Sequence, residues 1–273
     1  MQPKPGRRRL DERLVADGLA DSRTLAQAFI RSGRVLVDDV PHDKPGTRIS
    51  DAAAVRLRGP AKRYVSRGGD KLAAALAALG VPVEGRHCLD VGSSTGGFTD
   101  CLLQHGARHV VALDVGYGQL HEKLRQDARV TSVERTNART LGPTVLPGPD
   151  PLDLVTIDAS FISATLLLPR VAAVAPLAEI LVLVKPQFEV GRGEVGKGGV
   201  VRDEGLRARA ADDVQRCAEA QGYAVLGRVD SELAGPKGNR EIFLWLGRRP
   251  ADQSEREPDA GADVAGPTRR DWK

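Results

Sequence analysis

The stretch His87-Cys88-Leu89-Asp90-Val91-Gly92-Ser93-Ser94-Thr95-Gly96-Gly97-Phe98-Thr99 decides the fold. Its first five residues are typical of a buried strand, and the glycines after them predict a tight turn that leads into a helix. Glycine lets the backbone approach a ligand closely, and the N–H groups that begin a helix face that ligand. In α/β proteins this strand, turn and helix bind a nucleoside cofactor.

Strands and helices alternate on both sides of this motif. A helix carries Leu72, Leu76 and Leu79, and further helices are expected over residues 99–105 and 202–221. Strands are expected over residues 87–91, 109–114, 130–133, 154–158, 180–185, 224–229 and 241–246. This alternation predicts an α/β fold with a doubly wound, mainly parallel Rossmann-like sheet. The turn at residues 235–239 predicts a final hairpin that adds one antiparallel strand.

The first 58 residues have a different pattern. Two short helices are expected, one with Leu10, Leu14 and Leu19 and one that follows Asp21-Ser22 as an N-cap. Strands over residues 34–37 and 54–57 follow, with a turn at Asp38-Asp39. We therefore predict a small α+β domain over residues 7–58, a linker over 59–70, the large domain over 71–248 and a disordered tail over 249–273.

Charge is spread unevenly along the chain. Residues 1–71 carry 16 Lys and Arg against 9 Asp and Glu, although the whole chain has a formal charge of only +4. A basic front on a near-neutral body favours a module that binds a polyanion, and a solvated charged surface is the alternative. The candidate RNA-binding residues are Arg7, Arg8, Arg9, Arg13, Arg23, Arg31, Arg34, Lys62 and Arg63.

Other classes of protein fit less well. The three cysteines are far apart, without a CxxC pair, and are expected to be reduced. No ligand-spaced set of histidines, cysteines and acids predicts a metal site. The apolar residues 166–184 contain Pro169, Arg170, Pro176 and Glu179, so a helix followed by a buried strand is expected there instead of a membrane span. No signal peptide is apparent, and we expect a cytoplasmic protein without stable membrane association.

An acid about 20 residues beyond the glycine turn can accept hydrogen bonds from a ribose, and Asp114 has this position. NAD and S-adenosylmethionine both fit that feature. The spacing Asp-x-Gly-x-x-x-Gly-Gly differs from the usual NAD fingerprint, and the carboxylate of Asp90 suits an ammonium group better than a pyrophosphate, so S-adenosylmethionine is favoured. The candidate cofactor-binding residues are Asp90, Gly92, Ser94, Gly96, Gly97, Asp114, Asn137 and Asp158.

Several segments together resemble known families. Residues 7–58, with Ser22-Arg23 and Ile30-Arg31-Ser32-Gly33-Arg34-Val35, resemble an S4 RNA-binding domain. Residues 62–247 resemble the FtsJ-like methyltransferases, and the whole chain resembles the TlyA family, in which the two are fused. The segments that carry this resemblance are residues 64–72, 90–99, 158–163, 183–189 and 238–241.

This resemblance implies an S-adenosylmethionine-dependent methyltransferase that modifies ribose 2′-hydroxyls of ribosomal RNA, typically at cytidines of the 16S molecule, the 23S molecule or both. The family's Lys-Asp-Lys-Glu catalytic set falls on Lys71, Asp158, Lys185 and Glu241. Ribosomal subunits are the implied partners, and a monomer is expected. A ribose hydroxyl is a poor nucleophile, so the enzyme must align its oxygen and manage one proton, and Lys185 is the candidate for that task.

Three other functions remain open at this level. One is a non-catalytic RNA-binding factor of ribosome assembly, against which the intact four-residue set argues. A membrane-lytic protein is suggested by haemolysin names in the family, and the charged residues within 166–184 argue against it. A nucleotide-dependent dehydrogenase lacks its usual glycine spacing.

Overall fold

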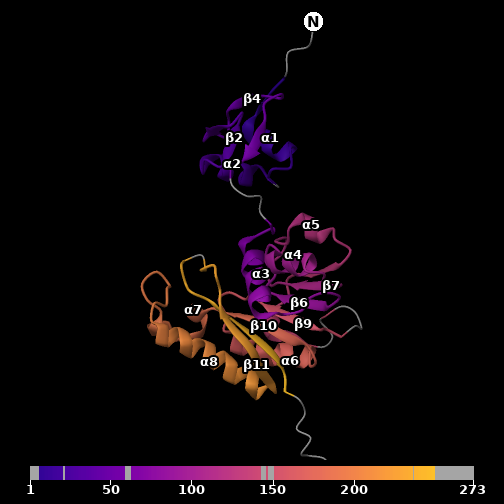
Figure 1. Ribbon diagram of the computed structural model, residues 1–273, viewed down its shortest axis with the longest axis vertical. Coiled ribbons are helices and arrows are strands. Elements are labelled where there is room, and N and C mark those ends of the chain that lie inside the picture. Colours follow the sequence, from indigo (N-terminus) through magenta and orange to yellow (C-terminus); the bar gives the residue numbers. More distant parts are fainter. Residues whose placement is uncertain are drawn as a thin grey trace, which may run out of the picture. The chain divides into compact units, whose positions relative to one another are not determined.

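The computed structural model describes residues 6–20, 22–58, 63–142, 146, 151–235 and 237–249. The chain divides into two compact units, Met1–Arg63 and Tyr64–Lys273, each with its own hydrophobic core (Figure 1). Lys62 and residues 250–273 of the predicted tail lie outside the described residues. Helix α3 (Arg67–Leu79) begins inside the segment predicted as a linker, because Tyr64 before it is buried and packs into the core of the second unit.

The first unit combines two helices with short strands. Helices α1 (Leu10–Ala16) and α2 (Arg23–Arg31) pack together, and Ser22 caps α2 by accepting a hydrogen bond from the backbone of Leu25, as predicted. A three-stranded sheet has the order β3-β2-β5, and a separate pair joins β1 to β4. The strands are β1 (Arg7–Arg9), β2 (Val35–Val37), β3 (Val40–His42), β4 (Arg48–Ser50) and β5 (Val55–Leu57).

The tight turn between β2 and β3 explains why the sequence analysis did not predict β3. Asp38 and Asp39 have φ angles of 48° and 66°, as in the tight turns that join two antiparallel strands directly. Val37 therefore pairs with Val40 across the turn, and β5 pairs with the other edge of β2. The predicted partner of β2 is present, and β1, β3 and β4 are additional.

The second unit contains a seven-stranded sheet of order β11-β12-β10-β9-β6-β7-β8. All of its pairings are parallel except those of β12, which lies antiparallel between β10 and β11. This confirms the predicted α/β class and the final hairpin. The strands are β6 (His87–Val91), β7 (His109–Leu113), β8 (Val130–Val133), β9 (Leu154–Ile157), β10 (Glu179–Val184), β11 (Tyr223–Asp230) and β12 (Ile242–Arg248).

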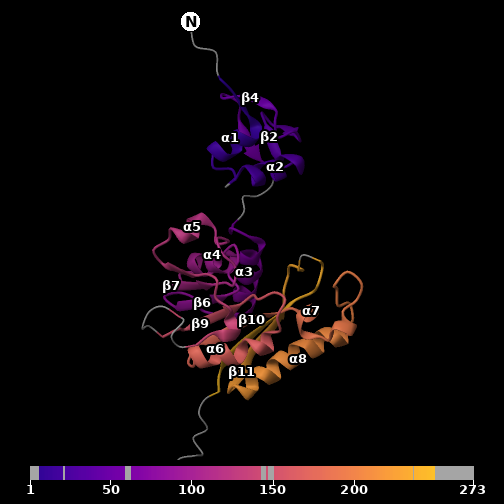
Figure 2. The ribbon, with the colours of Figure 1, turned by 180° about the vertical axis from the view of Figure 1, so that it is seen from behind.

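Helices cover both faces of this sheet (Figure 2). On one face α3 and α4 (Gly97–Gln104) pack on the side chains of Cys88, Val110 and Leu181. On the other face, α6 (Leu168–Val174) and α8 (Glu204–Ala220) pack on Leu89, Val111 and the other strand residues whose side chains point to that face. Since neighbouring side chains of a strand point to opposite faces, the apolar runs in the sequence bury both sides at once.

Short elements complete the connections between strands. They are α5 (Glu122–Arg125), α7 (Pro186–Glu189) and the 3-10 turns Ala138–Thr140, Ala164–Leu166 and Arg192–Glu194. Residues 166–184 form α6 and β10, as their prolines and charges predicted. Within the described part of the chain, we find no helix whose length and apolar character would let it cross a membrane.

Candidate active site

Four charged side chains meet at one edge of the large sheet. Asp158 and Lys185 directly follow the parallel strands β9 and β10. Glu241 precedes the antiparallel strand β12, whose first residue Ile242 is paired with Val184, so Glu241 reaches the same edge. Lys71 comes from the first turns of α3. The structure thus brings together the four residues that the family resemblance predicted.

These four residues form two ion pairs. Nζ of Lys71 lies 2.5 Å from Oε2 of Glu241, and Nζ of Lys185 lies 2.5 Å from Oδ1 of Asp158. Lys185 also donates a hydrogen bond of 3.0 Å to the hydroxyl of Ser160. Glu241 is only 1% exposed and Lys185 is 8% exposed. Because charges buried to this extent need partners, the pairing fixes each ammonium group in place.

Both pairs border one cavity of about 300 Å³. The glycine-rich turn forms part of its wall, and the start of α3 forms another part. Its lining residues are Ser66, Arg67, Gly68, Lys71, Gly92, Ser93, Ser94, Thr95, Gly97, Phe98, Asp158, Ser160, Lys185 and Glu241. Sequence analysis missed Ser66 and Ser160, although each stands inside a segment that carried the resemblance.

The glycines of the turn are needed for its shape. Gly92 has a φ angle of 85°, and a Cβ atom there would lie 2.7 Å from the carbonyl oxygen of Asp158. Gly96 has a φ angle of 94°, which a residue with a side chain rarely adopts. These two glycines let the turn pass close to the start of the next segment, and Gly92 lines the cavity without a side chain that would narrow it.

Asp114 lies where a ribose can be bound. One carboxylate oxygen accepts a hydrogen bond of 2.8 Å from the backbone of Ser94, and the other accepts one of 2.7 Å from Gly116. Asp114 lines a second cavity of about 390 Å³, which shares Gly92, Ser94, Asp158 and Ser160 with the first. A polar residue pair and an apolar wall together suit a nucleoside.

Asp90 points away from these cavities. It is fully buried, and its two oxygens accept hydrogen bonds of 2.7 Å from Thr99 and 3.1 Å from Thr156. Burial raises the pKa of Asp90 to about 7, and the nearby charge of Asp158 adds to that effect. In this conformation Asp90 braces the turn and does not line the cavity, in contrast to the ammonium contact expected from the sequence.

Asn137 also differs from the expectation. Its side chain accepts a hydrogen bond of 3.0 Å from the backbone of Arg139, as a cap of the short turn that follows. It lines a separate cavity with Phe161 and Phe188, whereas its neighbours Thr136 and Ala138 line the cavity that contains Asp114. The residues on either side of Asn137 therefore border the cavity that contains Asp114, whereas Asn137 itself borders a different one.

An aromatic pair lies beside the four charged residues. Phe161 is 91% exposed, and its ring centroid is 5.3 Å from that of Phe188. Both residues line a cavity of about 280 Å³ together with Lys185, Glu241 and Asn239. Sequence analysis assigned no role to these aromatic residues, although both stand in quoted segments and follow strand ends.

The predicted RNA-binding arginines of the first unit fall into two groups. Arg9 and Arg23 pair with the buried carboxylate of Asp11, and Arg13 pairs with Asp17. Arg9 and Arg23 hold the pKa of Asp11 well below its usual range, chiefly through the hydrogen bond from Arg9. Within the described residues, Arg7, Arg31 and Arg34 have no carboxylate partner. Nε of Arg8 lies 3.9 Å from Oδ1 of Asp51. Lys62 lies outside the described residues.

Two family models match this chain. The family model described as FtsJ-like methyltransferase matches residues 64–248, and the S4 domain model matches residues 8–54. The chain belongs to the TlyA family of FtsJ-like methyltransferases. It is 51% identical to the 16S/23S rRNA (cytidine-2'-O)-methyltransferase TlyA of Mycobacterium tuberculosis over 88% of this chain and 90% of that one. The resemblance, the fold class and the methyltransferase class are thereby confirmed.

Other TlyA relatives carry a different name. The chain is 42% identical to Hemolysin A of Brachyspira hyodysenteriae, over 86% of this chain and 98% of that protein. A solved structure described as a hemolysin from Streptococcus thermophilus is 39% identical, with a TM-score of 0.69 and 90% of each chain covered. The family to which this chain belongs therefore has members that bear both kinds of name.

Proposed function

We propose that this protein transfers the methyl group of S-adenosylmethionine to ribose 2′-hydroxyls of cytidines in ribosomal RNA. The observation that carries the proposal is the convergence of Lys71, Asp158, Lys185 and Glu241 on one cavity beside the glycine-rich turn. The identity to a relative named for that reaction supports the choice of substrate. The proposed substrate also implies a cytoplasmic protein, and we propose that the protein acts as a monomer.

The cavities fit the cofactor. Gly92, Gly96 and Gly97 form the close backbone turn, and Asp114 offers its carboxylate to a ribose. When bound, S-adenosylmethionine supplies an activated methyl group next to a sulfonium charge. The residues of the chain then have to align the acceptor oxygen with that methyl group and exclude competing water.

Lys185 is the residue that handles the proton. Asp158 and Ser160 hold its Nζ at the border between the cofactor cavity and the cavity lined by Phe161. We assign Lys185, in its neutral amine form, as the acceptor of the hydroxyl proton when the ribose oxygen takes the methyl group. The ammonium group that results is the form that pairs with Asp158 in this structure. The pair of Lys71 and Glu241 completes the polar wall that orients the ribose.

The first unit supplies affinity for RNA. Its unpaired arginines can contact phosphates, which gives binding that depends strongly on salt and little on sequence. Selection of one nucleotide then depends on the shape of the RNA around it.

The test is transfer of labelled methyl from S-adenosylmethionine to isolated 30S and 50S subunits of a strain that lacks the gene. We expect incorporation at ribose 2′-oxygens by the wild-type protein. Lys185→Ala should lower the rate about 10²- to 10⁴-fold while the Kd for S-adenosylmethionine, measured by calorimetry, stays the same. Lys123→Ala is the matched control, since that lysine is exposed and pairs only with Asp100 among the described residues.

Equal rates for Lys185→Ala and the wild type would exclude the assigned mechanism. Cofactor binding without incorporation into either subunit would exclude these substrates. A protein that binds NAD and not S-adenosylmethionine, or that releases dye from liposomes without methylating RNA, would contradict the proposed function altogether.

A further inference from the structure

The segment between β11 and β12 carries Glu241, and the three residues before β12 alternate in direction. Asn239 is 2% exposed, Arg240 is exposed and Glu241 is 1% exposed. In an extended chain, neighbouring side chains point to opposite sides. Asn239 and Glu241 therefore face the interior and the cavity, whereas Arg240 faces the other way.

Asn239 is bound on both sides of its amide. Its oxygen accepts a hydrogen bond of 2.9 Å from the backbone of Val201, and its nitrogen donates one of 2.8 Å to the carbonyl of Gly199. Both partners belong to the segment that leads into α8. The carbonyl of Asn239 also accepts a hydrogen bond of 2.9 Å from Gly235, which closes the turn before β12.

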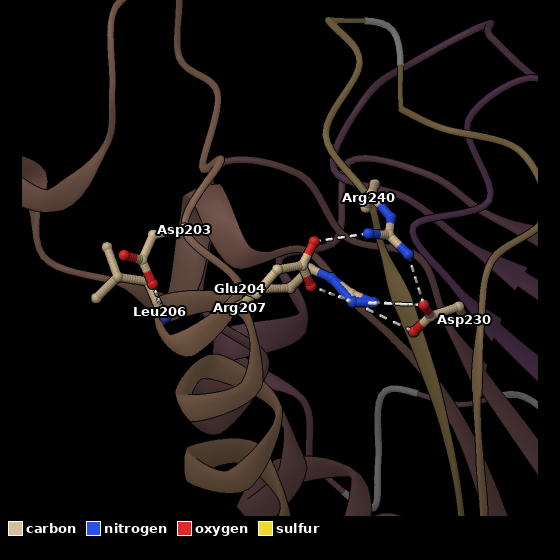
Figure 3. Close-up of polar contacts among 6 residues, drawn as sticks. All are labelled: Asp203, Glu204, Leu206, Arg207, Asp230 and Arg240. Carbon is tan, nitrogen blue, oxygen red and sulfur yellow. Dashed lines mark hydrogen bonds and ion pairs between the residues drawn. The ribbon is translucent and has the colours of Figure 1, made fainter.

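Arg240 belongs to a closed ring of four charged side chains (Figure 3). It donates hydrogen bonds of 2.6 Å to Glu204 and 3.2 Å to Asp230. Arg207 donates hydrogen bonds to the same two carboxylates from the other side, and its contact with Asp230 is shorter than its contact with Glu204. Glu204 and Arg207 lie in the first turn of α8, while Asp230 ends β11, so the ring joins three elements.

The ring is anchored in the interior. Arg207 is only 8% exposed, and a guanidinium group buried to this extent requires its carboxylate partners. Arg207 also holds the pKa of Asp230 below its usual range through their hydrogen bond. At the start of the helix, Asp203 caps α8 by accepting a hydrogen bond of 2.8 Å from Leu206, so Glu204 is presented from a fixed turn.

We propose that Asn239 and Arg240 are positioning residues, which hold the carboxylate of Glu241 against Lys71 by fixing the backbone immediately before it to the start of α8. This inference rests on the proposed function, because it assumes that the pair of Glu241 and Lys71 serves methyl transfer. The side chain of Glu241 has little room to adjust, since a Cβ atom on Gly235 would lie 2.6 Å from its Oε1. A shift of the backbone at Arg240 is therefore passed to the carboxylate.

Arg240→Ala tests the proposal, because the side chain of Arg240 points away from Glu241. We expect the single-turnover rate of methyl transfer to subunits to fall about tenfold, since small misplacements at a reacting centre are costly. KM for subunits and the Kd for S-adenosylmethionine should stay within about twofold. Glu204→Ala should lower the single-turnover rate to the same extent. The double variant Arg240→Ala/Glu204→Ala should be no slower than either single variant, because both substitutions break the same contact.

Arg228→Ala is the matched control. Arg228 lies on β11 two residues before Asp230 and donates a hydrogen bond of 2.8 Å to Asp212 of α8. It thus joins the same strand to the same helix by an ion pair but does not contact residues 239–241. We expect this variant to keep the wild-type rate and a similar Tm.

The decisive comparison uses Glu241→Gln. If Arg240 acts through Glu241, Arg240→Ala should cost about tenfold in the wild type and less than about twofold in the Glu241→Gln background. An equal cost in both backgrounds, or a rate for Arg240→Ala no lower than that of Arg228→Ala, would overturn the positioning role. If the wild-type protein does not methylate either subunit, the proposed function fails instead, so the two failures are distinguishable.

Discussion

Asp90 lies fully buried at the end of β6, where two threonine hydroxyls donate hydrogen bonds to it. Those two bonds favour the charged form, but the loss of hydration outweighs them and the pKa rises to about 7. The native protein therefore holds a proton on Asp90 at pH values where the unfolded chain has already released it. An acid with a raised pKa stabilises the folded state at low pH and loses that contribution as the pH rises through the folded value.

The corresponding prediction concerns Asp90→Asn. For the wild type, Asp90 should lower the free energy of unfolding by about 1.4 kcal/mol per pH unit as the pH rises from about 4 to about 7. The variant should lack that slope, because its amide does not titrate. Urea unfolding at a series of pH values measures the difference between the two proteins.

Asp127→Asn provides a control of opposite sign. The hydrogen bond from Arg129 lowers the pKa of Asp127. The contribution of ionised Asp127 to the free energy of unfolding is therefore lost only at lower pH. This variant should leave the slope between about pH 5 and pH 7 unchanged. The same slope in the wild type and Asp90→Asn would show that Asp90 is ionised in the folded protein.

At the scale of elements, the contact between α3 and α4 positions part of the site. A Cβ atom on Gly69 would lie 2.3 Å from the ring of Tyr64 and 2.8 Å from the carbonyl of Gly97. The two helices can approach this closely only because both positions lack a side chain. The contact holds the first turns of α3, which carry Lys71, against the start of α4 and the glycine-rich turn.

Gly69→Ala should therefore separate the two helices and lower the free energy of unfolding by about 1 to 3 kcal/mol. Gly68→Ala is a matched change one residue earlier, where the nearest atom to the added Cβ is 3.4 Å away. It should cause no loss, because alanine is also the better helix former. Denaturant unfolding of both variants tests this, and equal stabilities would contradict the close contact.

The sequence predicted the long elements of the fold but not three of its short strands, for a physical reason. Long apolar strands such as β6 and β10 and the 17-residue helix α8 carry clear periodic patterns, so their presence was predictable. Strands β1, β3 and β4 have three residues each, like β2 and β5, but they lack the apolar residues at both ends that marked β2 and β5 in the sequence. Their pairing depends on turns and on contacts between residues about 40 positions apart.

At the scale of the whole molecule, a small basic unit precedes a larger unit with the methyltransferase fold. Several arginines of the first unit are engaged in its own ion pairs, notably Arg9 and Arg23 with Asp11. Arg7 and Arg31 have no carboxylate partner within the described residues, so their charges are available to phosphates. RNA affinity should therefore depend on a subset of the basic residues that charge counting identifies.

The double variant Arg7→Gln/Arg31→Gln tests this division. In a plot of log K for RNA against log salt concentration, its slope should be smaller by about 1.4 to 1.8 than the wild-type slope. Arg56→Gln is the control, since the guanidinium of Arg56 is paired with Asp39 on the same unit at 2.6 Å. Binding of subunits titrated at several salt concentrations gives the slopes, and identical slopes would show that Arg7 and Arg31 do not contact phosphates.

The sequence by itself determined the class of the fold, the glycine-rich turn and the identities of the four charged residues of the site. These features depend on local periodicity, on the backbone freedom of glycine and on motifs that lie within short segments. Strand ends also indicated that Asp158 and Lys185 share an edge, since parallel strands present their carboxyl ends together.

Only the tertiary structure decided which way side chains point and which distant residues they meet. It turned Asp90 into the protein interior, placed Asn137 beside a different cavity and joined Arg240 to Glu204 and Asp230. Such contacts depend on the packing of elements far apart in sequence, and a polar side chain near a strand end can face either the cavity or the core. The balance between burial and hydrogen bonding settles that choice, and it exists only once the chain is folded.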